Sequence, residues 1–326
     1  MDNSSKKFDS ANALLSGKKD ILIAGHENPD ADAVGSALAL KLFLEDSGFS
    51  PVVFFADQVP KKFSFLPGFF EIRSELGKDE KFEVFLFLDY GDFKRLKLPD
   101  FSWPEDRIIT IDHHLGDQRG EVKIVDPASS SAAEIIYFWL QENPPVKIKI
   151  TRQEAVCLLC GIIGDTGCFS HVSTGPKTLR AASHLLSLGV SLEEIAAKTF
   201  SSGSLPYGES TRIFGKILSR IKAIPEKNIV YSWVSESDLK SHPSLIFDIS
   251  GAASIISKES SCDYALFLVE YEKGKVRGSL RSEPFKNKKV DSFARMLGGG
   301  GHPYAAGFKQ EGTIGEVLKK VIKVIE

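Results

Sequence analysis

The sequence predicts an α/β protein of two domains: an N-terminal domain on a parallel sheet and a smaller α+β domain with its own sheet. Short apolar runs alternate with helical stretches in the first half, which is typical of a parallel sheet covered on both faces. The 326 residues exceed what one core usually holds. Charge also divides, because residues 216–326 carry 18 basic and 13 acidic residues whereas residues 1–215 have a net charge of −7. We expect domains at 1–195 and 216–326, joined by a linker at 196–215.

The elements of the N-terminal domain follow from hydrophobic periodicity. Apolar runs with β-branched or aromatic content predict four strands, at Ile21–Ala24, Val52–Phe55, Val84–Leu88 and Ile108–Ile111. Helical spacing of apolar residues predicts four helices, at Ala33–Ser47, Ser131–Gln141, Arg152–Ile163 and Pro176–Leu188. Gly48 and Gly189 end the first and last of these helices.

The pattern changes after Ser201–Gly208, a stretch rich in Ser, Gly and Pro that is the best linker candidate. Asp263–Glu272 and Lys275–Ser282 flank a tight turn and predict a hairpin. Helical patterns then lie around Ser250–Lys258, Val290–Leu297 and Gly315–Ile325. This mixture is typical of an α+β domain.

Composition excludes several classes of protein. With 42% hydrophobic and 26% charged residues the chain is globular, and its net charge of −2 argues against a binder of long nucleic-acid tracks. No apolar run is long enough for a signal peptide or a membrane span, so a cytoplasmic location is expected. Cys157 and Cys160 lie within an apolar run and are expected to be buried and reduced.

Acidic and imidazole side chains follow the predicted strands where each one ends. The carboxyl ends of parallel strands meet at one edge of a sheet, where ligands bind. We therefore expect convergence of the following residues: His26, Asp30 and Asp32 after the first strand, Asp89 after the third, Asp112, His113 and His114 after the fourth, and Asp165 at the end of an apolar helix.

So many carboxylates in one crevice would repel one another unless a cation lay between them. Taken singly, each Asp has a simpler explanation as a turn or helix cap. Taken together with the histidines, they form a ligand set without thiolates, which suits Mn²⁺ or Mg²⁺. The set is too large for one ion, and pairs of ions about 3.5–4 Å apart are common in phosphoryl hydrolases.

The ordered motifs HENPDADAVGS, the Asp89 strand end, TIDHH and GIIGDTG resemble those of the DHH phosphoesterase superfamily. Gly298–Phe308, GGGGHPYAAGF, resembles the signature of a DHH-associated domain. The resemblance implies an active site in the cleft between two domains and two Mn²⁺ ions, with Mg²⁺ as the alternative. It assigns one ion to His26, Asp30 and Asp89, and the other to Asp32, Asp89, His113 and Asp165. Asp112 and His114 are implied as catalytic, Asp112 by orienting the site and His114 by meeting the substrate phosphate.

In the second domain, the resemblance implies that Arg281 and the loop of Gly299, Gly300, Gly301 and His302 bind the substrate. Consecutive glycines let backbone N–H groups approach an anion, and an Arg fork suits phosphate. The sequence departs from the family pattern near Ser170, where a basic or aromatic residue is expected, and at Pro303. Both departures concern substrate preference and leave the metal ligands unaffected.

The resemblance is to the stand-alone oligoribonuclease (nanoRNase) and 3′-phosphoadenosine 5′-phosphate (pAp) phosphatase group. It implies hydrolysis of short oligoribonucleotides to nucleoside 5′-monophosphates and removal of the 3′-phosphate of pAp. The alternatives are a linear or cyclic dinucleotide phosphodiesterase and a nucleotide-binding module without activity. The expected partners are short RNA or nucleotide 3′-phosphates, with no long nucleic-acid track and no membrane. An exposed edge of the parallel sheet favours a homodimer.

Overall fold

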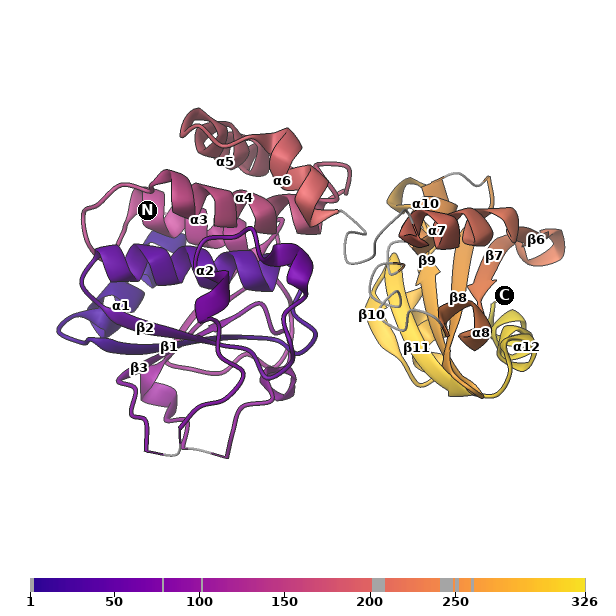
Figure 1. The fold of residues 1–326 in the computed structure, drawn as a ribbon, viewed down its shortest axis with the longest axis horizontal. Helices are drawn as coiled ribbons and strands as arrows, with labels where there is room; N and C mark the ends of the chain where they lie inside the picture. Colours follow the sequence, from indigo (N-terminus) through magenta and orange to yellow (C-terminus); the bar gives the residue numbers. More distant parts are fainter. Residues whose placement is uncertain are drawn as a thin grey trace. The chain divides into compact units, whose positions relative to one another are not determined.

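The computed structural model describes residues 3–77, 79–100, 102–200, 209–240, 249, 252–258 and 261–325. The chain divides into two compact units, Met1–Ser201 and Ser202–Glu326 (Figure 1). Both ends of the predicted linker 196–215 are helical, because α6 (Leu192–Thr199) reaches into it and α7 (Glu209–Ser219) begins within it. The division between the two units falls between Ser201 and Ser202. The predicted linker stretch Ser201–Gly208 otherwise lies outside the described residues.

The N-terminal unit contains a five-stranded parallel sheet of order β2-β1-β3-β4-β5. Its strands are β1 (Asp20–Gly25), β2 (Ser50–Phe54), β3 (Val84–Leu88), β4 (Ile108–Asp112) and β5 (Val122–Val125). The first four confirm the predicted strands to within two residues at each end. The fifth was not predicted, because it is only four residues long and its exposed Lys123 interrupts the apolar pattern.

Both faces of this sheet are covered, as predicted, and in the described part of the chain the α-helices lie on one of them. They are α1 (Asn3–Leu15), α2 (Ala31–Asp46), α3 (Ala132–Glu142), α4 (Arg152–Thr166), α5 (Pro176–Ser187) and α6. Their buried residues share one core with Ile21 and Ile23 of β1, and Figure 1 shows α2, α3 and α4 on the same side of the strands. On the other face, Phe85 and Phe87 pack against Trp103 and other aromatic side chains from loops and 3-10 turns. The large aromatic rings of these loops bury this face of the sheet.

Glycines let α2 and α4 approach at backbone distance near the site described below. A Cβ on Gly35 would lie 2.4 Å from the carbonyl oxygen of Cys157, and one on Gly164 would lie 2.4 Å from the Cβ of Ala31. The close crossing brings the start of α2 against the end of α4. Cys157 and Cys160 are buried as predicted, and burial raises the pKa of the Cys160 thiol to about 12.

We expect Gly164→Ala to lower the free energy of unfolding by about 1–3 kcal/mol, because the new methyl group overpacks the crossing of α2 and α4. Gly215→Ala is the matched control: Gly215 is also helical, but nothing lies within 4 Å of its Cβ position. That control should be neutral or stabilise by up to about 1 kcal/mol. Urea unfolding of both variants measures the difference, and equal stability of the two would contradict the close crossing.

The C-terminal unit contains a six-stranded mixed sheet of order β10-β11-β9-β8-β7-β6. The strands are β6 (Lys222–Ile224), β7 (Ile229–Val234), β8 (Tyr264–Glu272), β9 (Lys275–Arg281), β10 (Gly300–His302) and β11 (Ala305–Glu311), and only β7 and β8 pair in parallel. β8 and β9 confirm the predicted hairpin. Part of the glycine run, predicted as a loop, is strand β10.

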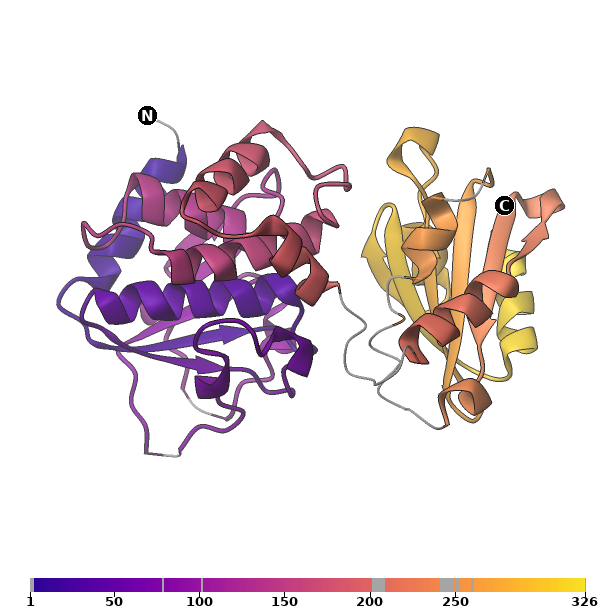
Figure 2. The ribbon, with the colours of Figure 1, turned by 45° about the horizontal axis from the view of Figure 1, so that its top comes forward.

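Two hydrophobic cores lie on opposite faces of this sheet. One contains residues of α11 (Asp291–Met296) and α12 (Ile314–Val324), and the other contains residues of α7 and α10 (Ala252–Lys258). Figure 2 shows the strands side by side with α7, in coral, crossing one face. A short helix, α8 (Glu236–Leu239), follows β7. Of all the helices described, none has the length and hydropathy to cross a membrane.

Candidate active site

The turn after β1 and the start of α2 form the first part of the site. Asp30 is the N-cap of α2, and its Oδ1 accepts hydrogen bonds from the backbone N–H groups of Asp32 and Ala33 at 3.0 and 3.1 Å. His26 Nδ1 lies 2.6 Å from the carbonyl oxygen of Glu27, to which it donates. His26 Nε2 then faces the Asp30 carboxylate at 3.6 Å. The N-cap and the imidazole are thus fixed by local backbone bonds.

Asp32 connects this turn to the start of α3. Its carboxylate accepts hydrogen bonds from the backbone N–H groups of Ala132 at 2.6 Å and Ala133 at 2.9 Å. Ser36 Oγ, one turn further along α2, donates to the same carboxylate at 3.1 Å. Asp32 is fully buried, and it lies at the positive end of the α3 dipole. The sequence did not reveal the role of Ser36; its only signal was a Ser four residues after an Asp in an apolar helix.

Asp89 directly follows β3 and lies at the centre of the site. Its backbone is in the left-handed region, at a φ of 52°. Asp89 Oδ1 lies 3.3 Å from His113 Nε2 and 3.2 Å from His114 Nδ1, while Oδ2 lies 3.6 Å from His26 Nε2. Asp89 therefore contacts imidazoles that follow two different strands.

His113 and Asp165 close the other side of the site. His113 Nε2 lies 3.0 Å from the Asp165 carboxylate and 4.0 Å from that of Asp32. Asp165 is near the end of α4, where the Gly164 crossing with α2 places it. The carbonyl oxygen of Asp165 accepts a hydrogen bond from His171 Nδ1 at 2.7 Å. His171 had no predicted role, and only the tertiary structure reveals this contact.

Asp112 orients its neighbours and belongs to none of the candidate metal-binding groups. Its Oδ2 accepts hydrogen bonds from the backbone N–H groups of Tyr90 and Gly91 at 3.1 and 2.8 Å. Its Oδ1 accepts from the backbone of His114 at 2.9 Å and lies 3.0 Å from His114 Nδ1. This geometry fixes both the turn after Asp89 and the ring of His114.

The histidine pKa values reflect the surrounding carboxylates. Burial lowers the pKa of each ring, but the neighbouring Asp side chains outweigh it. The pKa rises to about 11 for His26, about 12 for His113 and about 9 for His114. In the metal-free protein these raised pKa values favour the protonated form of the three rings.

The pKa values of the carboxylates shift in opposite directions, according to whether imidazoles or other carboxylates surround them. Burial opposes the charge on Asp89, but three imidazoles hold its pKa well below the usual range. Burial, followed by repulsion from Asp89 and Asp165, raises the pKa of Asp32 well above its usual range, although its hydrogen bonds act in the opposite direction. Burial likewise raises the pKa of Asp165 to about 6. The charge on Asp32 and Asp165 is thus costly without a cation.

The site fits divalent metal ions. Three groups bring their ligand atoms within 4.8 Å of one another, and they are His26–Asp30–Asp89, Asp32–His113–Asp165 and Asp89–His113–His114. Within the described part of the chain, neither buried Asp89 Oδ1 nor buried His113 Nε2 makes a well-aligned hydrogen bond, although each lies 3.0–3.3 Å from an oppositely charged side chain. A bound cation would satisfy both atoms. All six predicted ligands lie in these groups, and so does His114, which was predicted as a catalytic and substrate-binding residue and not as a metal ligand.

Metal binding should release protons, because imidazole binds a metal only when neutral. With His26 and His113 protonated in the metal-free protein, we expect binding of Mn²⁺ at pH 8 to release about two protons per chain. Raising the pH therefore strengthens binding. Calorimetric titration in buffers of different ionisation enthalpy measures this number. An observed enthalpy that is the same in every buffer would contradict the prediction.

The predicted substrate-binding residues lie together on the C-terminal sheet. Arg281 and His302 both pair with Ala305 of β11, from opposite sides. Arg281 Nε donates to Ser254 Oγ at 3.3 Å, and no ion pair joins it to a carboxylate of the described residues. The position of the two side chains in one row agrees with a shared anion, and their role stays a prediction.

The glycines of this segment differ in why they are needed. A Cβ on Gly299 would lie 2.1 Å from the carbonyl oxygen of Gly307, and one on Gly301 would lie 2.6 Å from that of Ala305. Packing of β10 against β11 therefore requires glycine at both positions. Nothing lies within 4 Å of the Cβ position of Gly300, so the backbone there is open on the Cβ side.

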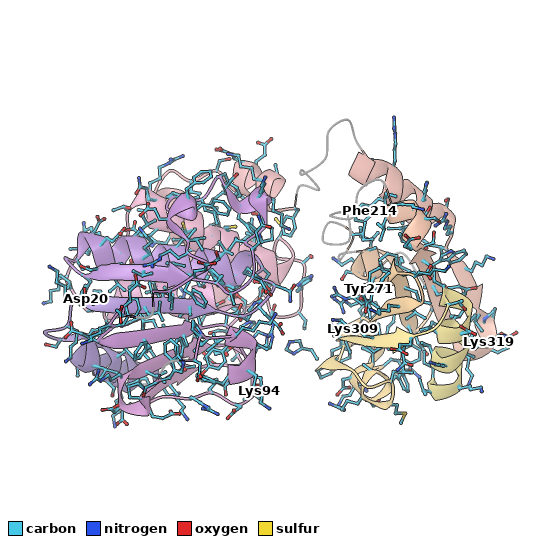
Figure 3. The ribbon with its side chains drawn as sticks, turned by 60° about the horizontal axis from the view of Figure 1, so that its bottom comes forward. Asp20, Lys94, Phe214, Tyr271, Lys309 and Lys319 are labelled. Atoms are coloured by element: carbon cyan, nitrogen blue, oxygen red, sulfur yellow. The ribbon has the colours of Figure 1, made fainter. Side chains whose placement is uncertain are left out.

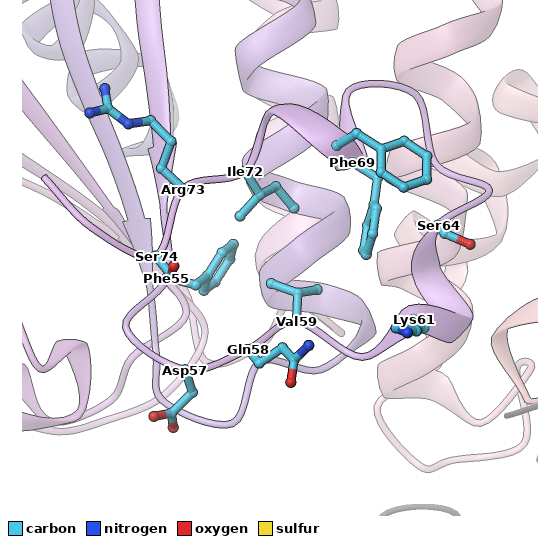
Figure 4. A pocket seen from close by; sticks show the side chains of 11 residues that line it. Phe55, Asp57, Gln58, Val59, Lys61, Ser64, Phe69, Ile72, Arg73 and Ser74 are labelled. Atoms are coloured by element: carbon cyan, nitrogen blue, oxygen red, sulfur yellow. The ribbon is translucent and has the colours of Figure 1, made fainter.

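A cavity of about 530 Å³ in the N-terminal unit lies elsewhere (Figure 4). Its lining includes Phe55, Phe69 and Ile72, and none of the clustered Asp or His side chains. Asp57, on its rim, accepts a hydrogen bond from the backbone of Asn28 at 2.8 Å. The cavity thus borders the turn after β1 without being part of the ligand cluster.

Two protein families match this chain, one in each of its two units. Residues 20–162 match the DHH family, N-terminal domain, and residues 226–326 match the DHHA1 domain. The bifunctional oligoribonuclease and PAP phosphatase NrnA of Thermus thermophilus is 28% identical over 94% of this chain and 89% of its own length. NrnA of Bacillus subtilis is 26% identical over 88% of each chain. The cyclic-di-AMP phosphodiesterase GdpP of Bacillus subtilis is 26% identical over 96% of this chain but 48% of its own length.

Among solved structures, an exopolyphosphatase-related protein from Bacteroides fragilis has the same fold. The TM-score is 0.86 and the identity 24%, over 98% of this chain and 96% of the other.

Proposed function

Because the chain belongs to the DHH phosphoesterase superfamily, we propose that it hydrolyses phosphate esters with two Mn²⁺ ions held by the clustered Asp and His side chains. Asp89 would contact both ions, His26 and Asp30 would complete one site, and Asp32, His113 and Asp165 the other. The ions would supply Lewis-acid stabilisation of charge on the phosphate oxygens. The unsatisfied pair Asp89 Oδ1 and His113 Nε2 is the observation that carries this proposal.

The remaining side chains of the site position the reacting groups. Asp112 contacts His114 Nδ1 and thereby fixes the orientation of the ring. We therefore assign the other ring nitrogen, His114 Nε2, to the contact with the substrate phosphate. The protonated form of His114, favoured by its raised pKa, would donate to a phosphate oxygen and balance its charge. In the C-terminal unit, Arg281 and His302, with the open backbone at Gly300, would bind a second phosphate or the substrate end.

We propose short oligoribonucleotides and pAp as substrates, with nucleoside 5′-monophosphates as products. Support comes from relatives named as oligoribonucleases and PAP phosphatases, which match this chain over most of both lengths. The relative named as a cyclic-di-AMP phosphodiesterase favours a dinucleotide phosphodiesterase as the second candidate. The two candidates share the metal site and differ in which substrate turns over fastest.

One assay panel with Mn²⁺ tests this proposal. It contains a dinucleotide, a five-nucleotide RNA, pAp, cyclic di-AMP and pyrophosphate. We expect turnover of the dinucleotide and pAp, its loss with EDTA, and its return with Mn²⁺ but not with Zn²⁺. Fast turnover of cyclic di-AMP alone would support the second candidate, and turnover of pyrophosphate alone would overturn both.

A further inference from the structure

One half of the C-terminal sheet carries cations on the face opposite the α11–α12 core. Along β9, Val276 and Leu280 face that core, whereas Arg277 is exposed on the other side. β11 pairs with β9 so that Lys309 lies directly opposite Arg277. Lys309 is also exposed, and Figure 3 labels it on β11. Two like charges therefore lie side by side on a sheet.

This pairing needs an explanation, because like charges directly opposite each other destabilise a sheet. Two nearby cations of this unit have acidic partners: Lys275 pairs with Glu272 at 2.8 Å, and Lys288 with Asp263 at 3.4 Å. Across residues 209–240, 252–258 and 261–325, no ion pair joins Arg277 or Lys309 to a carboxylate. An anionic ligand would remove the repulsion.

The same row of β9 continues to Arg281. Burial, and next the charge of Arg277, lowers the pKa of the Arg281 guanidinium, so the two cations act on each other. Four residues separate them along the strand, a distance of about 13 Å. Between them lie Ser279 and its partner Gly307, which are half-buried and place no large side chain between the two cations. Along this face of β9, the small residue Ser279 therefore separates the two cations Arg277 and Arg281.

We propose that Arg277 and Lys309 bind a backbone phosphate of an oligonucleotide, about 13 Å along β9 from the phosphate assigned to Arg281. An Arg fork and a Lys ammonium together suit a phosphate oxygen pair. A substrate with one nucleoside, such as pAp, reaches the Arg281 end only, whereas an RNA of several nucleotides reaches both positions. This inference rests on the proposed function and adds a contact that depends on substrate length.

The test compares Arg277→Gln/Lys309→Gln with the unchanged protein. Binding of a labelled five-nucleotide RNA is measured by fluorescence anisotropy in EDTA, over a range of salt concentrations. We expect the affinity to fall about tenfold, since hydrogen bonds to a charged group are lost. The slope of log K against log salt should fall by about 0.7, the value for one phosphate on a single strand. kcat/KM for pAp with Mn²⁺ should stay unchanged.

Lys319→Gln/Lys323→Gln is the matched control, because it removes the same charge from exposed positions on α12, which packs on the opposite face (Figure 3). It should leave the RNA affinity within twofold. Thermal unfolding adds a second measurement: removing the repelling pair should leave the melting temperature unchanged or raise it. Unchanged RNA affinity in the Arg277–Lys309 variant, or an equal loss for pAp, would overturn the inference. If the proposed function were wrong, the protein would turn over no nucleotide. The anisotropy measurement would still show whether Arg277 and Lys309 bind RNA.

Discussion

Asp89→Asn should lower kcat at least about 10³-fold and abolish tight Mn²⁺ binding. We assign Asp89 to both proposed ions, and its buried Oδ1 lies 3.3 Å from His113 Nε2 and 3.2 Å from His114 Nδ1. An amide carries no charge to hold either ion. In the metal-free protein the loss of the carboxylate should also lower the pKa values of the neighbouring imidazoles. Calorimetric Mn²⁺ titration and turnover of a dinucleotide measure the two effects.

Asp126→Asn is the matched control for this prediction. Asp126 also follows a strand of the same sheet, but its carboxylate accepts hydrogen bonds from Ala128 and Ser129 and lies in none of the ligand groups. It should keep Mn²⁺ binding and turnover within a fewfold. If Asp89→Asn retained full turnover, the assignment of Asp89 to both ions would be wrong. If the unchanged protein bound nucleotide without turning it over, the chain would be a binding module.

Asp32→Ala should lower both stability and activity. Its carboxylate accepts from the first two backbone N–H groups of α3, at 2.6 and 2.9 Å, and both groups are buried. Without it those donors lose their partners, at about 1–3 kcal/mol each, while relief of repulsion with Asp89 and Asp165 offsets part of the loss. We expect the free energy of unfolding in EDTA to fall by about 2–3 kcal/mol. Turnover with Mn²⁺ should fall at least about 10²-fold.

Ser131→Ala separates the two effects of Asp32. Ser131 is the N-cap of α3, and its Oγ accepts a hydrogen bond from the backbone of Glu134 at 3.0 Å. Its loss should cost about 1 kcal/mol of stability and leave Mn²⁺ affinity unchanged. Urea unfolding in EDTA and Mn²⁺ titration compare the variants. Equal unfolding free energies for Asp32→Ala and the unchanged protein would show that α3 does not depend on Asp32.

The elements that were predicted correctly are those with a strong local signal. β3 is a continuous apolar run, β4 contains three isoleucines in five residues, and α2 begins at an Asp cap and ends before Gly48. The missed elements have weak periodicity. β10 consists of two glycines and a histidine, which no strand propensity favours, and it exists because β11 pairs with it.

The ligand set was predictable for a different reason. Parallel strands all deliver their carboxyl ends to one edge, so the order of motifs alone brought Asp89, His113 and the turn after β1 together. The contact between Asp32 and the start of α3 joins residues 100 positions apart in the chain. No local pattern encodes such a contact. The same holds for the hydrogen bond from His171 to the carbonyl of Asp165.

By itself, the sequence determined the type of fold and the kind of chemistry. Hydrophobic periodicity is a local property, and ligand-type side chains at strand ends share an edge in any parallel sheet. Only the tertiary structure decided how the site is held and charged. Burial, the approach of α2 to α4 at Gly164, and the pairing of Arg277 with Lys309 depend on strands and helices that are distant in the chain. The sequence also predicted that both faces of the parallel sheet are covered, and only the tertiary structure decided that loop aromatics rather than helices cover one of them.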